Sequence, residues 1–293
     1  MSRWEATVTD VPPAKVALQD RLRHRAREIV GAYSPLLRWY RRLRPRWLWQ
    51  HTNPLGRATR RYVDEHGLTV RHGPFCGVTY PPSAIGRVGF LPTKLLGAYE
   101  ADLADILANA GGFDLFVDVG SSDGYYCVGY KRLFPTTQVI GFETNGAERT
   151  ISQRLASLNG VVFDARGTAA HHELNALPPG RLLLMTDIEG YEHDLVDPSL
   201  VPRLRDAMMI IEAHRKVHPD IVEVLCARFE RSHEIEFVHA RARDIADYQE
   251  LAGWDPDAAK RALFNARSLW LVLRPRTATP YAARPCARTV SDR

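Results

Sequence analysis

The chain has few cysteines, no long hydrophobic run and no signal-peptide pattern in its first ten residues. Its four cysteines lie far apart and form no Cys-x-x-Cys pair, which argues against a disulfide framework or a zinc ribbon (Cys76, Cys127, Cys226 and Cys286). No apolar stretch approaches the roughly 20 residues of a membrane-spanning helix, and the first ten residues lack the basic-then-apolar order of a signal peptide. These absences predict a cytoplasmic protein with reduced thiols.

The net charge of +5 is unevenly distributed along the 293 residues. Residues 1–73 hold 15 Lys and Arg against 6 Asp and Glu, whereas the remainder holds 24 against 28. The basic part is densest over residues 36–49, where aromatic side chains alternate with arginine (Trp39, Tyr40, Trp47 and Trp49). A solvated helix packed by its aromatic side explains this pattern, and peripheral contact with an anionic membrane is the alternative. Pro45 interrupts a long amphipathic helix, and nucleic acid is not expected as a partner.

Short apolar runs alternate with helical patterns from residue 114 onward, which predicts a mostly parallel sheet with helices on both faces. A hydrophobic content of 45% over this length supports one full α/β core. The strands are expected at 114–118, 137–142, 161–164, 182–188, 207–212, 234–239 and 268–273. The helices between them are expected at 125–134, 146–158, 190–196 and 220–231.

Three regions follow from this pattern. Residues 1–75 form a basic, partly helical extension, residues 76–274 form the main domain, and residues 275–293 are expected to be disordered. Within them, 51–92 is expected to be irregular because it is rich in Gly, Pro and His. Residues 91–112 are expected to form a helix that Gly111 and Gly112 end.

The stretch Phe116–Asn145 has the order of a nucleotide-binding βαβ unit. A short apolar strand ends in Asp118 and runs into the glycine-bearing loop 120–124. A helical segment then leads to a second apolar strand that ends in Glu143. Glycines let the loop approach a ligand closely, and an acid after the second strand accepts hydrogen bonds from ribose hydroxyls. The combination predicts an adenosine-containing ligand, and a glycine-rich turn without a ligand is the alternative.

The charges of this loop indicate which adenosine ligand is bound. Dinucleotides need a pyrophosphate cradle made of a helix amino terminus and glycine N–H groups. Here Asp118 and Asp123 place two carboxylates near the expected phosphates, so that repulsion disfavours an anion. S-adenosylmethionine fits better because it carries adenine, ribose, an ammonium and a sulfonium but no phosphate. A nicotinamide or flavin cofactor is the alternative.

Polar residues also follow the later strands, at the sheet edge where open α/β folds bind ligands. Gly167 lies in a small-residue turn, DARGTA, that could pack against adenine. We expect the cofactor to be bound by the strand-end and loop residues Asp118, Gly120, Ser121, Ser122, Gly124, Tyr125, Glu143, Thr144, Gly167 and Asp187.

Asp187 and Glu189 follow the fourth expected strand, and Glu212 and His214 the fifth. If strand geometry persists, each pair points one way, and the four groups converge. Attack of a hydroxyl on a sulfonium methyl needs a positioned nucleophile and a proton acceptor. We expect Asp187, Glu189 and His214 to be catalytic, with His214 as the base and Asp187 orienting it or sharing the task. Local capping and divalent-cation binding by these groups are the alternatives, and no metal is assigned.

The motifs DVGSSDGYY, GFETN, TDIEGYEHDL and IIEAHR, in this order and spacing, resemble those of the FkbM-type S-adenosylmethionine-dependent methyltransferases. The resemblance covers about residues 72–274. It implies a class I methyltransferase fold, which is a Rossmann-like, mostly parallel seven-stranded sheet. It also implies that Asp118 and Gly120 line the methionine end, Glu143 the ribose, and Asp187 the region of the methyl group.

The resemblance further implies O-methylation of a glycan, glycolipid or natural-product hydroxyl, so that a small-molecule or glycan acceptor is expected. The sequence departs from the family pattern at Tyr191, where a small residue is commoner, and at Asn265, where an acid often stands. Two other functions remain open: a non-catalytic protein that binds S-adenosylmethionine, and a nucleotide-dependent oxidoreductase of Rossmann-like fold.

Overall fold

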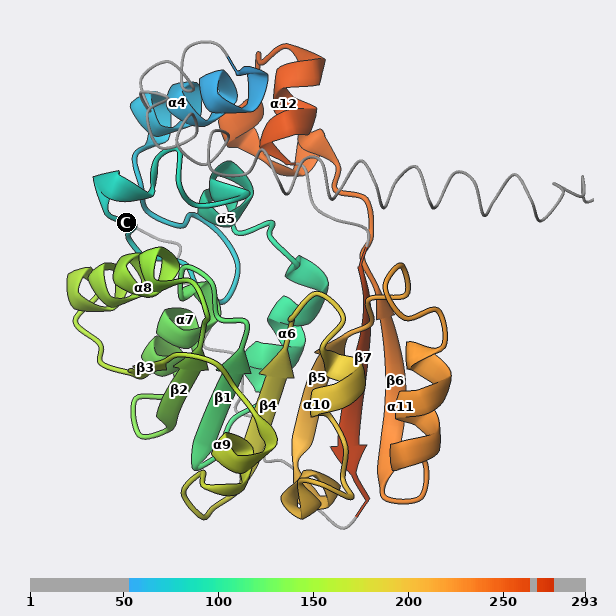
Figure 1. The fold of residues 1–293 in the computed structure, drawn as a ribbon. Coiled ribbons are helices and arrows are strands. Elements are labelled where there is room, and N and C mark those ends of the chain that lie inside the picture. The colour runs from blue at the N-terminus through green and yellow to red at the C-terminus, as the bar shows by residue number, and fades with distance from the viewer. Residues whose placement is uncertain (1–52, 264–267, 277–293) are drawn as a thin grey trace, which may run out of the picture. The chain divides into compact units, whose positions relative to one another are not determined.

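The computed structural model describes residues 53–263 and 268–276, which contain a seven-stranded sheet in the order β3-β2-β1-β4-β5-β7-β6 (Figure 1). The strands β1 to β5 pair in parallel, whereas β7 runs antiparallel to both β5 and β6. The sheet is the Rossmann-like arrangement of class I methyltransferases, which confirms the predicted fold. The strands are β1 (Leu115–Val119), β2 (Gln138–Phe142), β3 (Asp164–Arg166), β4 (Leu182–Thr186), β5 (Met208–Glu212), β6 (His233–His239) and β7 (Leu269–Pro275).

Two hydrophobic cores cover the two faces of the sheet, because neighbouring residues of a strand point to opposite sides. Along β1, Phe116 belongs to one core, whereas Leu115 and Val117 belong to the other. The first core includes side chains of α6 (Ala101–Asn109), α7 (Tyr125–Leu133) and α8 (Gly146–Leu158). The second includes side chains of α9 (His171–Asn175), α10 (Glu192–Leu195) and α11 (Ile221–Phe229).

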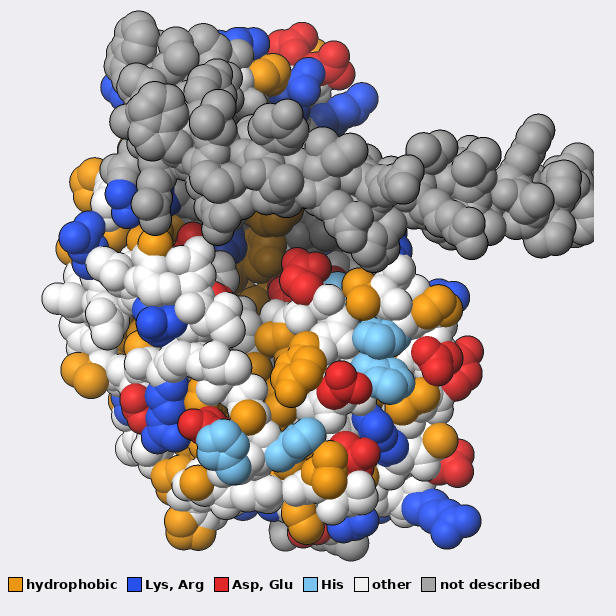
Figure 2. Space-filling model, viewed as in Figure 1, with side chains coloured by type: hydrophobic (Ala, Val, Ile, Leu, Met, Phe, Trp, Pro, Cys, Tyr) orange, Lys and Arg blue, Asp and Glu red, His pale blue; other side chains and the backbone are white. Residues whose placement is uncertain are grey.

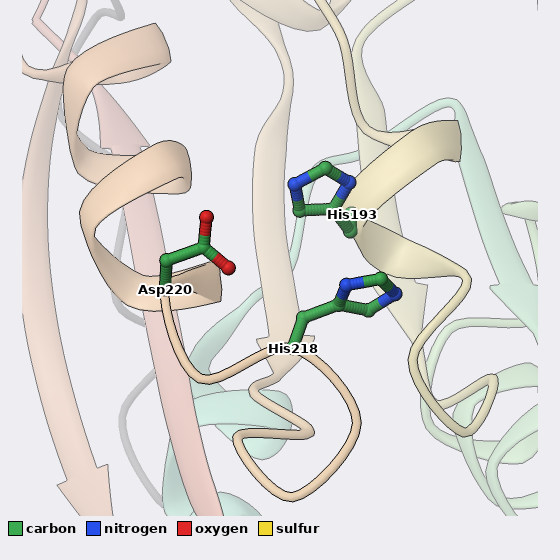
Figure 3. Close-up of side chains that lie close together, drawn as sticks. All are labelled: His193, His218 and Asp220. Carbon is green, nitrogen blue, oxygen red and sulfur yellow. The ribbon is translucent and has the colours of Figure 1, made fainter.

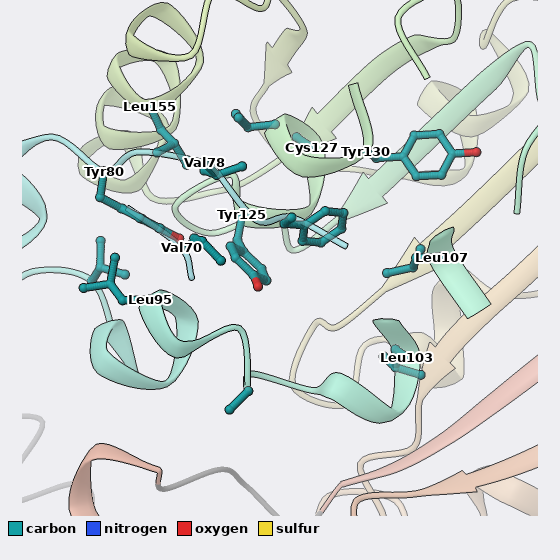
Figure 4. Close-up of a cluster of buried hydrophobic side chains, with 14 of the residues drawn as sticks. Val70, Val78, Tyr80, Leu95, Leu103, Leu107, Tyr125, Cys127, Tyr130 and Leu155 are labelled. Carbon is teal, nitrogen blue, oxygen red and sulfur yellow. The ribbon is translucent and has the colours of Figure 1, made fainter. Parts of the chain in front are cut away.

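The first core extends beyond the sheet to residues that precede β1. Figure 4 shows Val70, Val78 and Tyr80 of this region beside side chains of the helices α5 to α8. Tyr80 is fully buried, and its hydroxyl donates a hydrogen bond of 2.7 Å to Asp123 in the loop after β1. The segment before the sheet is therefore packed against the edge that carries the ligand-binding motifs.

The segment 51–92 is not irregular as predicted, because it contains the helix α4 (Pro54–His66) and a short 3-10 turn, Pro82–Ala84. The Asn53 side chain caps α4 by accepting hydrogen bonds from two backbone N–H groups of its first turn. This helix packs against α12 (Pro256–Ala262), almost two hundred residues later in the chain. Only a few residues of α4 are buried, and most of the others are polar, so the sequence shows no clear helical pattern of apolar residues here.

The single helix predicted at 91–112 is two helices, α5 (Leu91–Leu96) and α6. Gly97 ends α5 in the left-handed conformation, with φ of 74°. A Cβ at this position would lie 2.0 Å from the carbonyl oxygen of His72, so the close approach of the two segments requires glycine. The break turns the chain toward the ligand-binding edge, where Tyr99 and Glu100 follow.

One further local prediction is wrong, because the third strand begins at Asp164 and not at 161. The strand β6 begins at His233, which is fully buried and whose Nε2 lies 2.8 Å from the Ala207 carbonyl oxygen. The arginine- and tryptophan-rich region, Asn265 and the carboxy-terminal tail from 277 lie outside the described residues. In the part of the chain that is described, no helix is long and apolar enough to cross a membrane.

Candidate functional site

Two adjoining cavities lie at the carboxyl ends of the parallel strands, with volumes of about 410 Å³ and 320 Å³. Both are lined by Gly120, Glu143, Asp187 and Glu189. The larger one extends to the loop after β3, and the smaller one to the aromatic residues around α5 and α7. Figure 2 shows this face of the molecule hollowed, with acidic and hydrophobic side chains in the wall. Of the ten residues expected to bind the cofactor, nine line one or both cavities, and Gly124 lines neither.

The loop after β1 passes very close to the loop after β4. Gly120 has φ of 90°, and a Cβ on it would lie only 1.9 Å from the Asp187 carbonyl oxygen. Only glycine satisfies both the left-handed backbone and this contact. Gly120 and Asp187, which meet at this contact, line both cavities.

Four of the five backbone N–H groups of this loop, those of residues 120, 121, 122 and 124, donate hydrogen bonds within the protein. Gly120 and Ser121 both donate to the Phe142 carbonyl oxygen, at 2.8 and 2.9 Å, and Gly124 donates to Ser121. The N–H of Ser122 donates to the Glu143 carboxylate at 3.0 Å. A pyrophosphate would need such groups pointing free into the site. The loop therefore does not form a phosphate cradle.

Glu143 stands at the end of β2, between the two cavities. Its carboxylate accepts hydrogen bonds from the N–H groups of Ser122 and of Asn145, the latter at 2.6 Å. These bonds orient the carboxylate. Oε1 also accepts a hydrogen bond of 3.5 Å from the Thr144 hydroxyl, whereas Oε2 keeps a lone pair for a hydroxyl donor. Thr144 and Gly167 line the larger cavity as predicted for a cofactor pocket, and Gly167 has open space where a Cβ would lie.

Asp118 lies beneath the smaller cavity and is only 3% exposed. Burial raises the pKa of its carboxyl group to about 7, and the nearby Asp187 and Asp123 carboxylates add to the shift. The thiol of Cys127 lies 3.5 Å from it and partly offsets this increase. A cation bound in the cavity would favour the ionised form of Asp118.

Asp123 does not present a free negative charge to the ligand, contrary to the prediction from its place in the loop. It is 1% exposed and forms a buried ion pair with Lys94 of α5, in addition to the hydrogen bond from Tyr80. The sequence analysis missed Lys94, since no local pattern pairs residues 29 positions apart. The loop is therefore less acidic than its sequence suggests.

Four aromatic side chains surround the Lys94 end of the smaller cavity: Phe90, Tyr99, Tyr125 and Tyr126. The Lys94 ammonium lies 4.8 Å from the ring centre of Tyr99 and 5.5 Å from that of Tyr125. Beside them, burial raises the pKa of Glu100 to about 7, although the Tyr126 hydroxyl donates a hydrogen bond to it. The Lys94 ammonium is itself a cation of the kind that such electron-rich ring faces stabilise. Of these rings, only Tyr125 was predicted.

His214 is the centre of an acidic cluster at the ends of β4 and β5. Its Nε2 lies 3.5 Å from Asp187, 3.7 Å from Glu189 and 3.9 Å from Glu212. Its Nδ1 lies 3.0 Å from Glu192, outside the angular range of a hydrogen bond. The predicted convergence of three carboxylates and an imidazole is confirmed, and a fourth carboxylate joins them.

The cluster holds its protons more tightly than isolated side chains would. Burial, reinforced by Glu212, raises the pKa of Asp187 to about 8. Burial alone would lower the pKa of His214, but the carboxylates of Glu192, Glu212 and Asp187 outweigh it and raise this pKa to about 9. At neutral pH the imidazole is consequently protonated in the free protein.

Glu189 lies at the exposed edge of the cluster, whereas Glu192, to which the sequence analysis assigned no role, is buried beside it. The strand β4 ends at Thr186, and Glu189 lies in the turn beyond it with φ of 57° and a side chain that is 91% exposed. It is Glu192, fully buried, that organises this turn by accepting hydrogen bonds from the N–H groups of Ile188 and Gly190. The motif TDIEGYEHD contains Glu192, but periodicity alone did not separate it from the exposed acids.

The same cluster offers ligand atoms for a divalent cation. One atom each of Asp187, Glu212 and His214 lies within 4.8 Å of the others. Carboxylate oxygens with an imidazole suit several divalent metals. Cation binding therefore remains an alternative to proton transfer at this position.

Models of known protein families do not match this chain, and neither does any curated protein sequence. Solved structures do resemble it. A precorrin-6y C5,15-methyltransferase from Geobacter metallireducens is 12% identical over 59% of this chain and 86% of that chain, with a TM-score of 0.44. An rRNA methylase from Streptococcus thermophilus is 11% identical over 58% and 92%, with a TM-score of 0.42.

A third structure is a tRNA (uracil-54, C5)-methyltransferase from Pyrococcus abyssi in complex with S-adenosyl-L-homocysteine. It is 16% identical over 62% of this chain and 38% of that chain, with a TM-score of 0.39. Likenesses of this size identify neither a family nor an acceptor. The expectation that nucleic acid is not a partner stays a prediction.

Proposed function

We propose that the protein is an S-adenosylmethionine-dependent O-methyltransferase of the FkbM type, acting on a hydroxyl of a glycan, glycolipid or natural product. One observation carries the cofactor assignment. Four N–H groups of the loop after β1 already donate hydrogen bonds to protein oxygen atoms, and carboxylates and aromatic rings line the adjoining cavities. Such a site suits a ligand with adenosine and positive charges, and it disfavours the pyrophosphate of a nicotinamide or flavin dinucleotide.

The residues present fit this cofactor. In the proposal, Glu143 accepts hydrogen bonds from the ribose hydroxyls, and the turn at Gly167 lies against adenine in the larger cavity. Gly120, Ser121, Ser122 and Tyr125 line the smaller cavity, where Asp118 faces the methionine end. When bound, the cofactor supplies an electrophilic methyl group on a sulfonium.

In the proposed reaction the chain's own residues position the acceptor and accept its proton. His214 in its neutral form takes the hydroxyl proton on Nε2, the ring nitrogen that faces Asp187 at 3.5 Å. Asp187 stabilises the imidazolium that results, and Glu192 holds the opposite side of the ring. The exposed carboxylate of Glu189, at the rim, contacts the acceptor or attracts the cofactor.

Support for an uncharged acceptor comes from the charges around His214. In the reactive form, with a neutral His214 and an ionised Asp187, four carboxylates lie within 4.0 Å of the ring, so a phosphate or carboxylate near the methyl group would meet repulsion. Sugar and alcohol hydroxyls avoid this cost. The order of the motifs DVGSSDGYY, GFETN, TDIEGYEHDL and IIEAHR supports the FkbM-type assignment.

Transfer of a labelled methyl group from S-adenosylmethionine to a panel of acceptors tests the proposal. The panel contains hydroxyl-bearing glycans and natural products, with transfer RNA and ribosomal RNA as the competing class. Label in a base-stable methyl ether of a neutral acceptor is the expected result. Label only in RNA would replace the proposed acceptor class. S-adenosylmethionine binding without label in any acceptor would favour a non-catalytic binding protein.

Replacing Glu143 with alanine is expected to weaken S-adenosylhomocysteine binding by about 1.5–3 kcal/mol, or about 10- to 200-fold in Kd, because charge-assisted hydrogen bonds to the ribose are lost. Calorimetric titration measures the change. Glu236→Ala is the matched control, since Glu236 lies on the distant strand β6 and pairs there with Arg274 of β7. Equal affinity in both variants would remove Glu143 from the site.

The value of kcat/KM is expected to rise about tenfold per pH unit between pH 7 and pH 9, and then to level off. The reason is that the carboxylates around His214 raise its pKa to about 9, so the neutral imidazole that accepts a proton becomes abundant only near that pH. Initial rates in a mixed buffer of constant ionic strength show the profile. A flat profile over this range would mean that proton acceptance by His214 does not limit the reaction.

A further inference from the structure

A second group of potential metal ligands lies beside the acidic cluster, on the outer side of α10. It consists of His193, His218 and Asp220, whose ligand atoms lie within 4.8 Å of one another. Figure 3 shows the two imidazole rings one above the other, His193 from α10 and His218 from the loop after β5, with the Asp220 carboxylate beside them. The proposed methyl transfer assigns no role to any of the three.

The two imidazole rings stack face to face, which holds them together but does not by itself aim their nitrogen lone pairs at one point. Their ring centres are 4.5 Å apart with an interplanar angle of 17°. The Nδ1 of His193 lies 3.0 Å from the Asp194 carboxylate. This contact favours the tautomer with its proton on Nδ1, which leaves the Nε2 lone pair for a metal. Histidine ligands commonly have such a carboxylate behind them.

The backbone around the group is fixed at both ends. Arg228 of α11 donates hydrogen bonds to the carbonyl oxygens of His193 and Val196, and it pairs with Asp197 at 3.1 Å. On the loop side, Val217 approaches Gly190 so closely that a Cβ there would lie 2.7 Å from it. The two histidines are therefore held near each other before any ligand binds.

We propose that His193, His218 and Asp220 form a binding site for Zn²⁺ or a closely similar late transition metal. Two imidazoles and one carboxylate, with a water as the fourth ligand, are a common set for tetrahedral zinc. Magnesium and calcium prefer all-oxygen sites, so they are not expected to compete. Donor atoms around zinc lie roughly 3.4 Å apart for bonds of about 2.0–2.1 Å. The ligand atoms lie within 4.8 Å of one another, so the two imidazole rings must rotate out of their stacked arrangement, and the exposed Asp220 side chain must turn, for all three to bind one ion.

The metal would join α10 to the loop that carries His214. Glu192, next to His193 in sequence, contacts the ring of His214 from α10, and His218 is four residues beyond His214. A zinc ion on the outer side would hold these two segments together and fix the position of His214 between them. The proposed zinc ion has a structural role, and the proposal of this site does not depend on the proposed methyl transfer.

Calorimetric titration of the tag-free full-length protein with ZnCl₂, in buffer that contains millimolar Mg²⁺, tests the site. One zinc ion per chain with micromolar or tighter affinity is expected, together with a higher Tm. His193→Ala and His218→Ala are each expected to weaken this binding by at least about 10–100-fold. His172→Ala, whose side chain is 82% exposed, is the control and is expected to bind zinc normally.

A fourth variant, His214→Ala, separates this site from the acidic cluster, and it is expected to keep the zinc. Cobalt substitution supplies an independent signal, since tetrahedral Co²⁺ with imidazole ligands absorbs visible light strongly. That band is expected in the wild type and in His214→Ala but not in His218→Ala. Absence of zinc binding in the wild type would overturn the proposal. So would binding that survives both alanine variants or that only His214→Ala removes.

Discussion

Replacing His214 with alanine is expected to lower kcat by about 10²–10⁴-fold, the usual contribution of a positioned general base. The binding of S-adenosylhomocysteine should change little, since neither cavity is lined by His214. Single-turnover rates with labelled cofactor and calorimetric titration of the same variant measure the two effects separately. A large loss in rate with unchanged affinity would distinguish a base from a residue that only shapes the pocket.

The His214→Ala variant also removes the positive partner of four carboxylates, so its thermal stability has to be measured beside its rate. Glu192 keeps its two backbone hydrogen bonds in the variant, which limits the structural damage. His172→Ala serves again as the exposed control. A normal rate in His214→Ala would contradict the proposed role and leave Asp187 or a divalent cation in the cluster as the agent that activates the hydroxyl.

Replacing Gly120 with alanine is expected to reduce the free energy of unfolding by about 2–5 kcal/mol and to abolish measurable cofactor binding. The left-handed backbone costs about 1–2 kcal/mol for any residue with a Cβ, and forced repacking adds about 1–3 kcal/mol. The added methyl group would overlap the Asp187 carbonyl oxygen at 1.9 Å, so the loops after β1 and β4 must separate. Urea unfolding and calorimetric titration measure the two changes.

Gly167→Ala is the matched control for this prediction. Gly167 also lines the larger cavity, but it has no left-handed φ and nothing lies within 4 Å of its Cβ position. Its stability is expected to stay within about 0.5 kcal/mol of the wild type. If Gly120→Ala were as stable as Gly167→Ala, the close contact between the two loops would not exist in solution.

Local patterns in the sequence predicted most of the sheet and the edge at which the site lies. Short apolar strands that end in Asp118 and Glu143 are recognisable because a buried parallel strand otherwise stays apolar to its end. The same reasoning found Asp187 and Glu212 at the ends of the next two central strands. The structure places all four acids around adjoining cavities or in the acidic cluster that borders them.

The contacts that sequence analysis missed are long-range ones. Lys94 and Asp123 form their buried pair across 29 residues, so nothing local reveals that the loop acid is neutralised. The helix α4 was missed because its stability depends on packing against α12, near the other end of the chain. Glu192 was overlooked because its importance comes from complete burial, which a row of acids in sequence does not show.

The central claim is that this edge of the sheet binds S-adenosylmethionine and not a dinucleotide. Calorimetric titration of the wild-type protein with S-adenosylhomocysteine, and in parallel with NADH and FAD, tests it most directly. Micromolar binding of S-adenosylhomocysteine, with no heat from either dinucleotide, is the predicted result. Binding of NADH or FAD in preference to S-adenosylhomocysteine would contradict the account, because it would require a phosphate cradle that the loop from Gly120 to Gly124 does not form.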